Sequence, residues 1–266
     1  MAGHFVPKFD LLPVEVHPDR RSLGRAAGMA VAAKIRELLG RQERVRMIFA
    51  AAPSQNEFLE TLRGAEKIDW KRVTAFHMDE YLGLSADAPQ SFRRYLKERL
   101  FDRVHPGEVH LIAGEAPSPE EECARYAHLL AEAPIDIVCL GIGENGHLAF
   151  NDPPVADFAD PKMVKVVELD EACRRQQVHD GCFARFEEVP THAITLTIPV
   201  LLSGGWLYCV VPGPTKREAV EKALTSPISP ACPASILRTH ARARLYLDRD
   251  SAGGLGEAGG TTDKRP

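Results

Sequence analysis

Short apolar runs alternate along this chain with segments whose apolar residues recur at helical spacing. Leu23, Ala27 and Val31 follow one another at intervals of four, which predicts a helix over residues 20–40 that ends at Gly40. Short runs that are apolar throughout are typical of strands buried on both faces of a parallel sheet. The chain therefore combines the two patterns from which α/β proteins are built.

The same patterns place the remaining elements. We predict strands over residues 45–52, 73–78, 109–112, 135–140, 163–169, 193–197, 206–211 and 244–247. We predict further helices over residues 55–62, 91–101, 119–131 and 216–224. Strands that alternate with helices of this length indicate βαβ units. We therefore expect an α/β fold, a modified Rossmann-like single domain with a mostly parallel sheet and helices on both faces.

The chain shows no internal repeat and no interdomain linker, so we assign residues 1–249 to one domain. From Asp250 onward the chain is rich in Gly, Ser and Thr and lacks apolar groups, so we expect residues 250–266 to be a disordered tail. Residues 152–192 are charged and interrupted by prolines. This composition favours a mobile lid over the strand ends.

Composition narrows the class of protein. At 266 residues, with 44% hydrophobic and 26% charged residues, the chain can bury a sizeable core. Its formal net charge of −4 argues against a nucleic-acid or anionic-membrane partner. The six cysteines form no close pair, and no signal-peptide pattern or long apolar stretch occurs. We therefore expect a cytoplasmic protein without a disulfide framework or structural zinc.

The most informative segment begins with the apolar run 135–140 and continues into Gly141, Gly143 and Gly146. Glycine allows the backbone to turn tightly and to lie close to a ligand. His147 follows at once, and ligands of open α/β sheets bind at the carboxyl ends of strands. The segment therefore predicts a binding or active site that includes Gly141 and His147.

One alternative for this segment is a dinucleotide site, because its glycines match the Gly-x-Gly-x-x-Gly fingerprint. Glu168 or Asp170 would then serve as the ribose-binding acid. That fingerprint requires a long crossover helix directly after the third glycine, whereas Pro153, Pro154 and Pro161 interrupt the chain there. The prolines argue against this alternative.

Three segments carry a resemblance to a known family. Residues 141–153, Gly-Ile-Gly-Glu-Asn-Gly-His-Leu-Ala-Phe-Asn-Asp-Pro, resemble the signature of the glucosamine-6-phosphate deaminase/isomerase family. Residues 76–83, Phe-His-Met-Asp-Glu-Tyr-Leu-Gly, resemble its second signature, and residues 213–216, Gly-Pro-Thr-Lys, resemble its phosphate-binding turn. The similarity runs from about residue 25 to residue 248, and the motifs follow in the same order and spacing.

The resemblance implies catalytic roles for the polar residues of these motifs. Asp79 would be the base that moves a proton between carbons 2 and 1 of the sugar, whereas an isolated Asp at this place would read as a turn or helix cap. His147 would open the sugar ring, oriented by Asn145 and Asp152. Well-known members have Asp and Glu at the last two positions. An amide such as Asn145 can orient an imidazole but cannot stabilise its charge.

Binding roles follow in the same way. Lys216 aligns with the family's phosphate lysine, and Ser54 retains a hydroxyl in the turn where the family carries a Thr-Gly-Gly-Thr loop. Ser54 could equally be a simple N-cap, and the neighbouring Pro53 has no backbone N–H to donate. The family also places an arginine in the lid. Gln177 aligns with that position. Either Arg174 or Arg175 substitutes for the arginine, or the phosphate loses one charge-assisted contact.

The resemblance implies conversion of glucosamine 6-phosphate and water to fructose 6-phosphate and ammonia, without a metal or organic cofactor. The substrate class is a small amino sugar phosphate, and the family's varied assemblies allow a homo-oligomer. A 6-phosphogluconolactonase shares the fold and the glycine-rich loop, but the residues after His147 follow the deaminase pattern. The further alternative is a non-catalytic sugar-phosphate sensor, although the chain carries no helix-turn-helix module.

Overall fold

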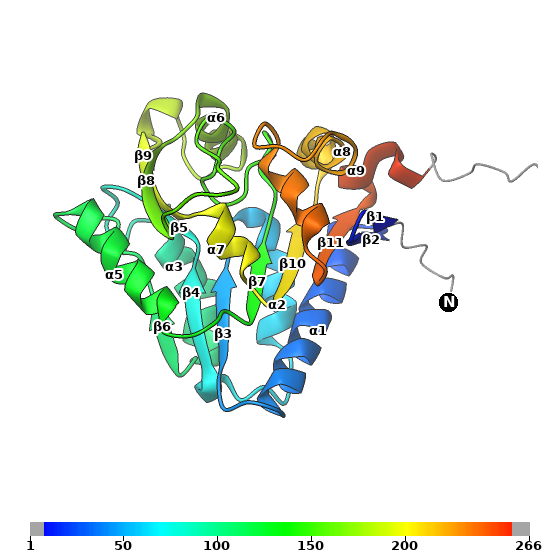
Figure 1. Ribbon diagram of the computed structural model, residues 1–266, viewed down its shortest axis with the longest axis horizontal. Coiled ribbons are helices and arrows are strands. Elements are labelled where there is room, and N and C mark those ends of the chain that lie inside the picture. The colour runs from blue at the N-terminus through cyan, green and yellow to red at the C-terminus, as the bar shows by residue number, and fades with distance from the viewer. Residues whose placement is uncertain (1–7, 257–266) are drawn as a thin grey trace, which may run out of the picture.

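The computed structural model describes residues 8–256, in which the central element is a sheet ordered β1-β2-β11-β10-β7-β3-β4-β6 (Figure 1). Every neighbouring pair in it is parallel except β1 with β2. The strands are β1 (Lys8–Phe9), β2 (Leu12–His17), β3 (Val45–Phe49), β4 (Val73–His77), β6 (Glu108–His110), β7 (Ile137–Leu140), β10 (Trp206–Val211) and β11 (Ala243–Asp248). The predicted mostly parallel α/β sheet is confirmed.

Helices cover both faces of this sheet, as predicted. Successive strand residues point to opposite faces. Ile48 accordingly packs in one hydrophobic cluster, while Met47 and Phe49 pack in the other. The helices on the Met47 side are α1 (Arg20–Leu39), α2 (Asn56–Arg63) and α3 (Phe92–Leu96). Those on the Ile48 side are α5 (Pro119–Ala131), α7 (Ile198–Leu202) and α8 (Arg217–Thr225).

Helix α1 shows how local sequence sets this packing. Asp19 and Ser22 form a capping box at its start, and Gly40 ends it, as the sequence predicts. A Cβ on Gly24 would lie only 2.5 Å from the Cβ of Glu57 on α2. The two helices therefore approach closely because this position lacks a side chain.

A second, three-stranded sheet lies above the carboxyl ends of the central strands in Figure 1. It consists of β5 (Asp79–Tyr81), β9 (His192–Leu196) and β8 (Val164–Glu168), with β9 antiparallel to both neighbours. Helix α6 (Glu171–His179) lies in the connection from β8 to β9. The segment expected to form a lid, residues 152–192, thus contains β8 and α6 and ends where β9 begins.

The chain order identifies where a ligand should bind. From β3 the chain moves outward to β4 and β6, then returns to β7 on the other side of β3 and moves outward to β10 and β11. The direction reverses between β3 and β7. In open α/β sheets, ligands bind at the carboxyl ends of strands at such a reversal.

Several elements were not predicted: β1, β2, β5, α6, α7, the short helix α4 (Asp102–Val104) and α9 (Arg249–Ala252). The predicted start of the disordered tail was also misplaced, because Asp250 lies inside α9, which Asp248 caps through the Ser251 amide. Residues 257–266 of that tail lie outside the described residues.

Two further findings bear on the class of protein. Within residues 8–256, the helices are too short or too polar to cross a bilayer. All six cysteines fall in this range, and each has a free thiol.

Candidate active site

A pocket opens at the carboxyl ends of β3, β4, β7 and β10, where the chain direction reverses. The residues that line it come from the turns after these strands and from the lid segment. They include the predicted Ser54, Asp79, Gly141, His147, Gln177 and Lys216, together with Gln55, Met78, Phe92, Gly143, Phe150, Gln176, Asp180 and Cys182. The structure therefore brings together most of the residues that the sequence singled out.

Asp79 is the first residue of β5 and stands one residue beyond the end of β4. Only 7% of it is exposed, and its carboxylate accepts no side-chain hydrogen bond from any residue between 8 and 256. Burial raises the pKa of the Asp79 carboxyl well above its usual value, and the charge of Glu80 acts in the same direction. An unpartnered carboxylate of raised pKa is suited to accept a proton near neutral pH.

His147 is held through its Nδ1 atom. This atom lies 2.8 Å from Oδ1 of Asn145 and 2.9 Å from Oδ1 of Asp152. Both neighbours are acceptors, because the Asn145 amide nitrogen donates its own hydrogen bond to Asp152 over 2.9 Å. The arrangement therefore places the proton on Nδ1 and leaves Nε2 available for exchange with a ligand.

Asp152 is fully buried beneath this imidazole. Burial alone would raise its pKa, but the facing His147 and hydrogen bonds from His147, Asn145 and the Asp170 amide lower the pKa below its usual value. Asp170 also accepts a hydrogen bond from the Asn145 amide over 3.3 Å. The carboxylate of Asp170 is thus linked to His147 through the side chain of Asn145. The sequence reasoning did not predict this contact.

One cluster of side chains around His147 contains atoms of the kinds that bind metal ions. His147, Asp152 and Cys173 bring a nitrogen, an oxygen and a sulfur within 4.8 Å of one another, the one such group found among residues 8–256. Two of these atoms already face each other across a hydrogen bond. We therefore interpret the cluster as a proton relay with a buried thiol beside it.

The turn after β3 leads into α2 and presents Ser54 to the pocket. The Ser54 hydroxyl oxygen accepts a hydrogen bond from the Gln55 side chain over 3.1 Å, so its own hydrogen is free to donate. The buried Gln55 amide also donates to the Val210 carbonyl of β10, which ties this turn to the neighbouring strand. Helix α2 has no side-chain cap, so its first N–H groups add to the positive end of its dipole.

Lys216 extends this region from the turn after β10. Gly213 adopts a φ of 96°, a left-handed conformation that favours glycine, and Lys216 ends the short 3-10 turn that follows. Burial lowers the pKa of Lys216, while Asp180 and Glu144 act in the opposite direction. Lys216 is the one lysine or arginine that the described part of the chain contributes to the pocket lining.

The lid contributes amides to the pocket. Gln176 of α6 accepts a hydrogen bond from the Glu144 amide over 2.7 Å and donates to Asp180 over 3.2 Å. It thereby links the lid helix to the glycine-rich loop. Gln177 is buried beside it and lines the pocket.

The structure does not place Arg175, one of the predicted replacements for the family's lid arginine, in the pocket. Its side chain is 61% exposed, pairs with Glu171 and does not line the pocket. Arg174 is directed elsewhere as well, because it donates to the carbonyls of Phe186 and Val189 and stacks on the Phe186 ring. Among residues 8–256, the side chains with a positive charge or a hydroxyl group that line the pocket are therefore Lys216 and Ser54.

The sequence reasoning also missed two aromatic walls of the pocket. Phe92 at the start of α3 and Phe150 after the glycine-rich loop stack with ring centroids 5.7 Å apart. Phe150 lies inside the glycine-rich signature, and Phe92 directly follows the N-cap Ser91. Neither position carries a polar group that would have marked it as functional.

The family described as glucosamine-6-phosphate isomerases/6-phosphogluconolactonase matches residues 18–246. A glucosamine-6-phosphate deaminase of an Exiguobacterium species is 40% identical over 193 residues, which cover 73% of this chain and 74% of that protein. A glucosamine-6-phosphate deaminase of Listeria monocytogenes is 38% identical over 70% of this chain and 77% of its own length.

Solved structures agree in fold. A monomeric glucosamine-6-phosphate deaminase superposes with a TM-score of 0.83 at 30% identity, over 90% of this chain and 98% of that one. A 6-phosphogluconolactonase from Thermotoga maritima superposes with a TM-score of 0.72 at 21% identity, over 88% of this chain and 98% of that one, and shares the fold. By its sequence and its fold, this chain belongs to the glucosamine-6-phosphate isomerase/6-phosphogluconolactonase family.

Proposed function

We propose that this protein is an amino-sugar-phosphate deaminase that converts glucosamine 6-phosphate and water to fructose 6-phosphate and ammonia. The observation that carries the proposal is the unpartnered carboxylate of Asp79, which lines the same pocket as the imidazole of His147. The names of the relatives supply the substrate.

In the proposed first step, His147 opens the sugar ring. Its Nε2 atom carries a proton from the carbon-1 hydroxyl to the ring oxygen, which breaks the bond between carbon 1 and that oxygen. Asp152 and Asn145 hold Nδ1 and keep the imidazole oriented. The Asp152 charge stabilises the imidazolium that forms while the proton is in transit.

In the proposed second step, Asp79 removes the proton from carbon 2 and returns it to carbon 1. The aldehyde that ring opening creates at carbon 1 makes the carbon-2 proton acidic. The amine nitrogen gives up a proton and the carbon-1 oxygen gains one, so the product is an imine at carbon 2 with a hydroxyl on carbon 1. Water then adds to the imine before ammonia leaves. A base of raised pKa accepts and returns the proton with little free-energy loss in either direction.

The phosphate would lie at the opposite end of the pocket. Lys216 would supply one charge, the Ser54 hydroxyl one hydrogen bond, and the positive end of the α2 dipole a favourable field. Gly141 lies beside this turn, where a Cβ would come within 3.1 Å of the Gln55 amide. Gln177 adds a neutral amide where the family has an arginine.

The alternative within the family is hydrolysis of a sugar lactone. That reaction cleaves an ester and removes no proton from carbon, so it has no use for a base at Asp79. The buried position of Asp79 therefore favours the deaminase.

The decisive experiment measures ammonia release from a panel of 6-phosphorylated amino sugars by the wild-type protein and by Asp79→Asn. We expect release from glucosamine 6-phosphate that falls about 100- to 10,000-fold in the variant, the usual contribution of a general base. Hexose-phosphate binding, measured by calorimetry, should survive the substitution. Undiminished ammonia release by Asp79→Asn, or lactone hydrolysis without ammonia release by the wild type, would overturn the proposal.

A further inference from the structure

Glu80, the residue after Asp79, is fully buried and belongs to no part of the pocket lining. Successive residues of a strand point to opposite faces, so the carboxylate of Glu80 is directed away from the pocket that Asp79 lines. Burial of a carboxylate is costly unless it is hydrogen-bonded or paired with a cation. Glu80 therefore needs a specific reason to occupy this position.

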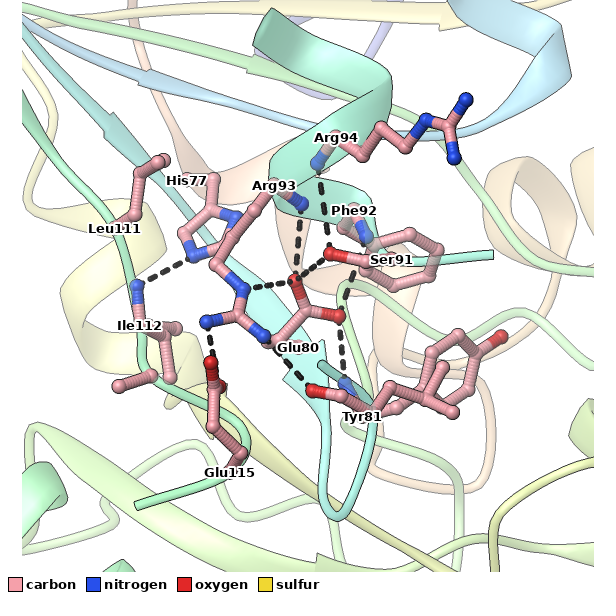
Figure 2. Close-up of polar contacts among 12 residues, drawn as sticks. His77, Glu80, Tyr81, Ser91, Phe92, Arg93, Arg94, Leu111, Ile112 and Glu115 are labelled. Atoms are coloured by element: carbon pink, nitrogen blue, oxygen red, sulfur yellow. Dashed lines mark hydrogen bonds and ion pairs between the residues drawn. The ribbon is translucent and has the colours of Figure 1, made fainter. Parts of the chain in front are cut away.

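Figure 2 shows what surrounds it. One carboxylate oxygen of Glu80 accepts hydrogen bonds from the backbone N–H groups of Tyr81 and Phe92, over 3.0 and 3.2 Å. The other accepts from the Ser91 hydroxyl over 3.1 Å and from the Arg93 backbone N–H over 2.9 Å. The Arg93 guanidinium completes the arrangement at 3.2 Å. Burial raises the pKa of Glu80, whereas the charge of Arg93 and the backbone hydrogen bonds from Arg93, Phe92 and Tyr81 act to lower it. Every contact comes from a donor, which suits an ionised carboxylate.

These contacts join two walls of the pocket. Ser91 is the N-cap of α3, and Phe92 and Arg93 are its first residues, so Glu80 closes the free N–H groups at the start of that helix. Phe92 lines the pocket, as Asp79 does from the adjoining position of β5. One buried carboxylate thus fixes the strand that carries Asp79 to the helix that carries Phe92.

We propose that Glu80 is a positioning residue for the base Asp79: it anchors β5 to the start of α3 and places a fixed negative charge beside the reacting carboxylate. This inference rests on the proposed function, because it assigns Glu80 a part in that reaction.

The charge acts on Asp79 in a definite direction. A like charge nearby disfavours ionisation, and Glu80 raises the pKa of Asp79 in addition to the effect of burial. Three further ionisable groups interact with Asp79, the phenols of Tyr81 and Tyr126 and the thiol of Cys173. Burial raises their pKa values, so they stay neutral near pH 7. His147, Asp180, Cys182 and Lys216 line the pocket that Asp79 faces.

Two variants separate position from charge. Glu80→Gln keeps the shape of the side chain but removes its charge and leaves Arg93 less compensated. We expect the acidic limb of the kcat/KM profile for ammonia release to move down by about one pH unit, and kcat to fall at least about tenfold. Glu80→Asp keeps the charge but shortens the side chain. It should lower kcat without moving the acidic limb.

Glu115 provides the matched control. Its carboxylate pairs with the other side of the Arg93 guanidinium over 2.6 Å, but its side chain is 46% exposed and contacts neither β5 nor α3 through a backbone N–H. Glu115→Gln should retain the wild-type kcat and pH profile. A Glu80→Asp variant with wild-type kcat, or the same acidic limb in Glu80→Gln and the wild type, would overturn the inference.

A measurement without turnover keeps this test independent of the proposed function. The carboxyl carbons of 13C-labelled aspartates are titrated by NMR in the wild type and in Glu80→Gln, with Asp79 assigned from Asp79→Asn. We expect the Asp79 midpoint to fall by about one pH unit in Glu80→Gln. An unchanged midpoint contradicts the inference. A wild type that releases no ammonia, combined with a shifted midpoint, overturns the proposed function and leaves the coupling of Glu80 to Asp79 in place.

Discussion

The Oδ1 atom of Asp152 lies 2.9 Å from Nδ1 of His147, on the side of the imidazole turned away from its exchangeable Nε2. Asn145 contacts the same nitrogen over 2.8 Å but contributes no charge. Asp152 is therefore the group that stabilises an imidazolium at this position. Because the Asp152 carboxylate is fully buried, water does not help to stabilise that charge.

We expect Asp152→Asn to lower kcat for ammonia release about 100-fold while KM changes only a few-fold, because the charge is needed only while the proton is in transit. Steady-state kinetics at several pH values checks this. An Asp152→Asn variant with wild-type kcat would show that Asn145 alone suffices.

Gly143 is a second point of control over His147. A Cβ at this position would lie 2.1–2.3 Å from atoms of the His147 ring, so any side chain must displace the imidazole. We expect Gly143→Ala to fold and to lose about 100-fold in kcat, the typical effect of misplacing a catalytic group by about 1 Å. Gly64→Ala is the control, since the nearest atom to its Cβ is 3.5 Å away. Equal activity of both variants would contradict this prediction.

Lys216 and Arg175 form a matched pair of cations for testing phosphate recognition, because only Lys216 lines the pocket. Lys216→Gln should raise KM for glucosamine 6-phosphate about 10- to 100-fold, the equivalent of about 1.5–3 kcal/mol for a charge-assisted contact. Arg175→Gln should leave KM unchanged, since that side chain is exposed and pairs with Glu171. A comparable rise in KM for Arg175→Gln would mean that the lid rearranges when substrate binds.

His77 gives a prediction about stability. Burial lowers the pKa of His77 from 6.5 to about 3, and Arg93 acts in the same direction. The unfolded chain therefore binds one more proton than the folded protein between pH 3 and 6.5. The contribution of the neutral imidazole is complete above pH 6.5 and declines below it, by about 1.4 kcal/mol per pH unit.

His77→Gln tests this, since glutamine can still accept the hydrogen bond that the Ile112 amide donates to His77 over 2.8 Å. Urea unfolding of both proteins between pH 4 and 7 should show a shallower loss of stability in the variant. Parallel curves for the two proteins would refute the assignment.

The sequence predicted the elements whose signal is local. Ile137–Leu140 and Trp206–Val211 are buried on both faces and read as continuous apolar runs. The strand Asp79–Tyr81 was missed, because it begins with two acids and exists through its pairing with residues 193–195, more than a hundred positions away. Propensity within a short window contains no information on such pairing.

Arg175 was a candidate for the pocket for a similar reason. The helix Glu171–His179 is polar and was not predicted. Its buried residues Cys173, Gln176 and Gln177 stand at positions i, i+3 and i+4, which form one face of a helix. Arg175 falls outside that face. Recognition of the helix would have excluded it from the pocket.

The chain leaves the large sheet at Met78, whose carbonyl accepts a hydrogen bond from Leu196 of the small sheet. Asp79 is thus borne by the small sheet, whereas His147 and Lys216 follow strands of the large one. In the proposed reaction, the residue that opens the ring and the base that moves the proton between carbons are therefore held by different sheets. Substitutions where the two sheets meet, around Met78 and Leu196, would change the fraction of opened sugar that proceeds to the imine. The fraction that closes again would be measured as exchange between anomers without deamination.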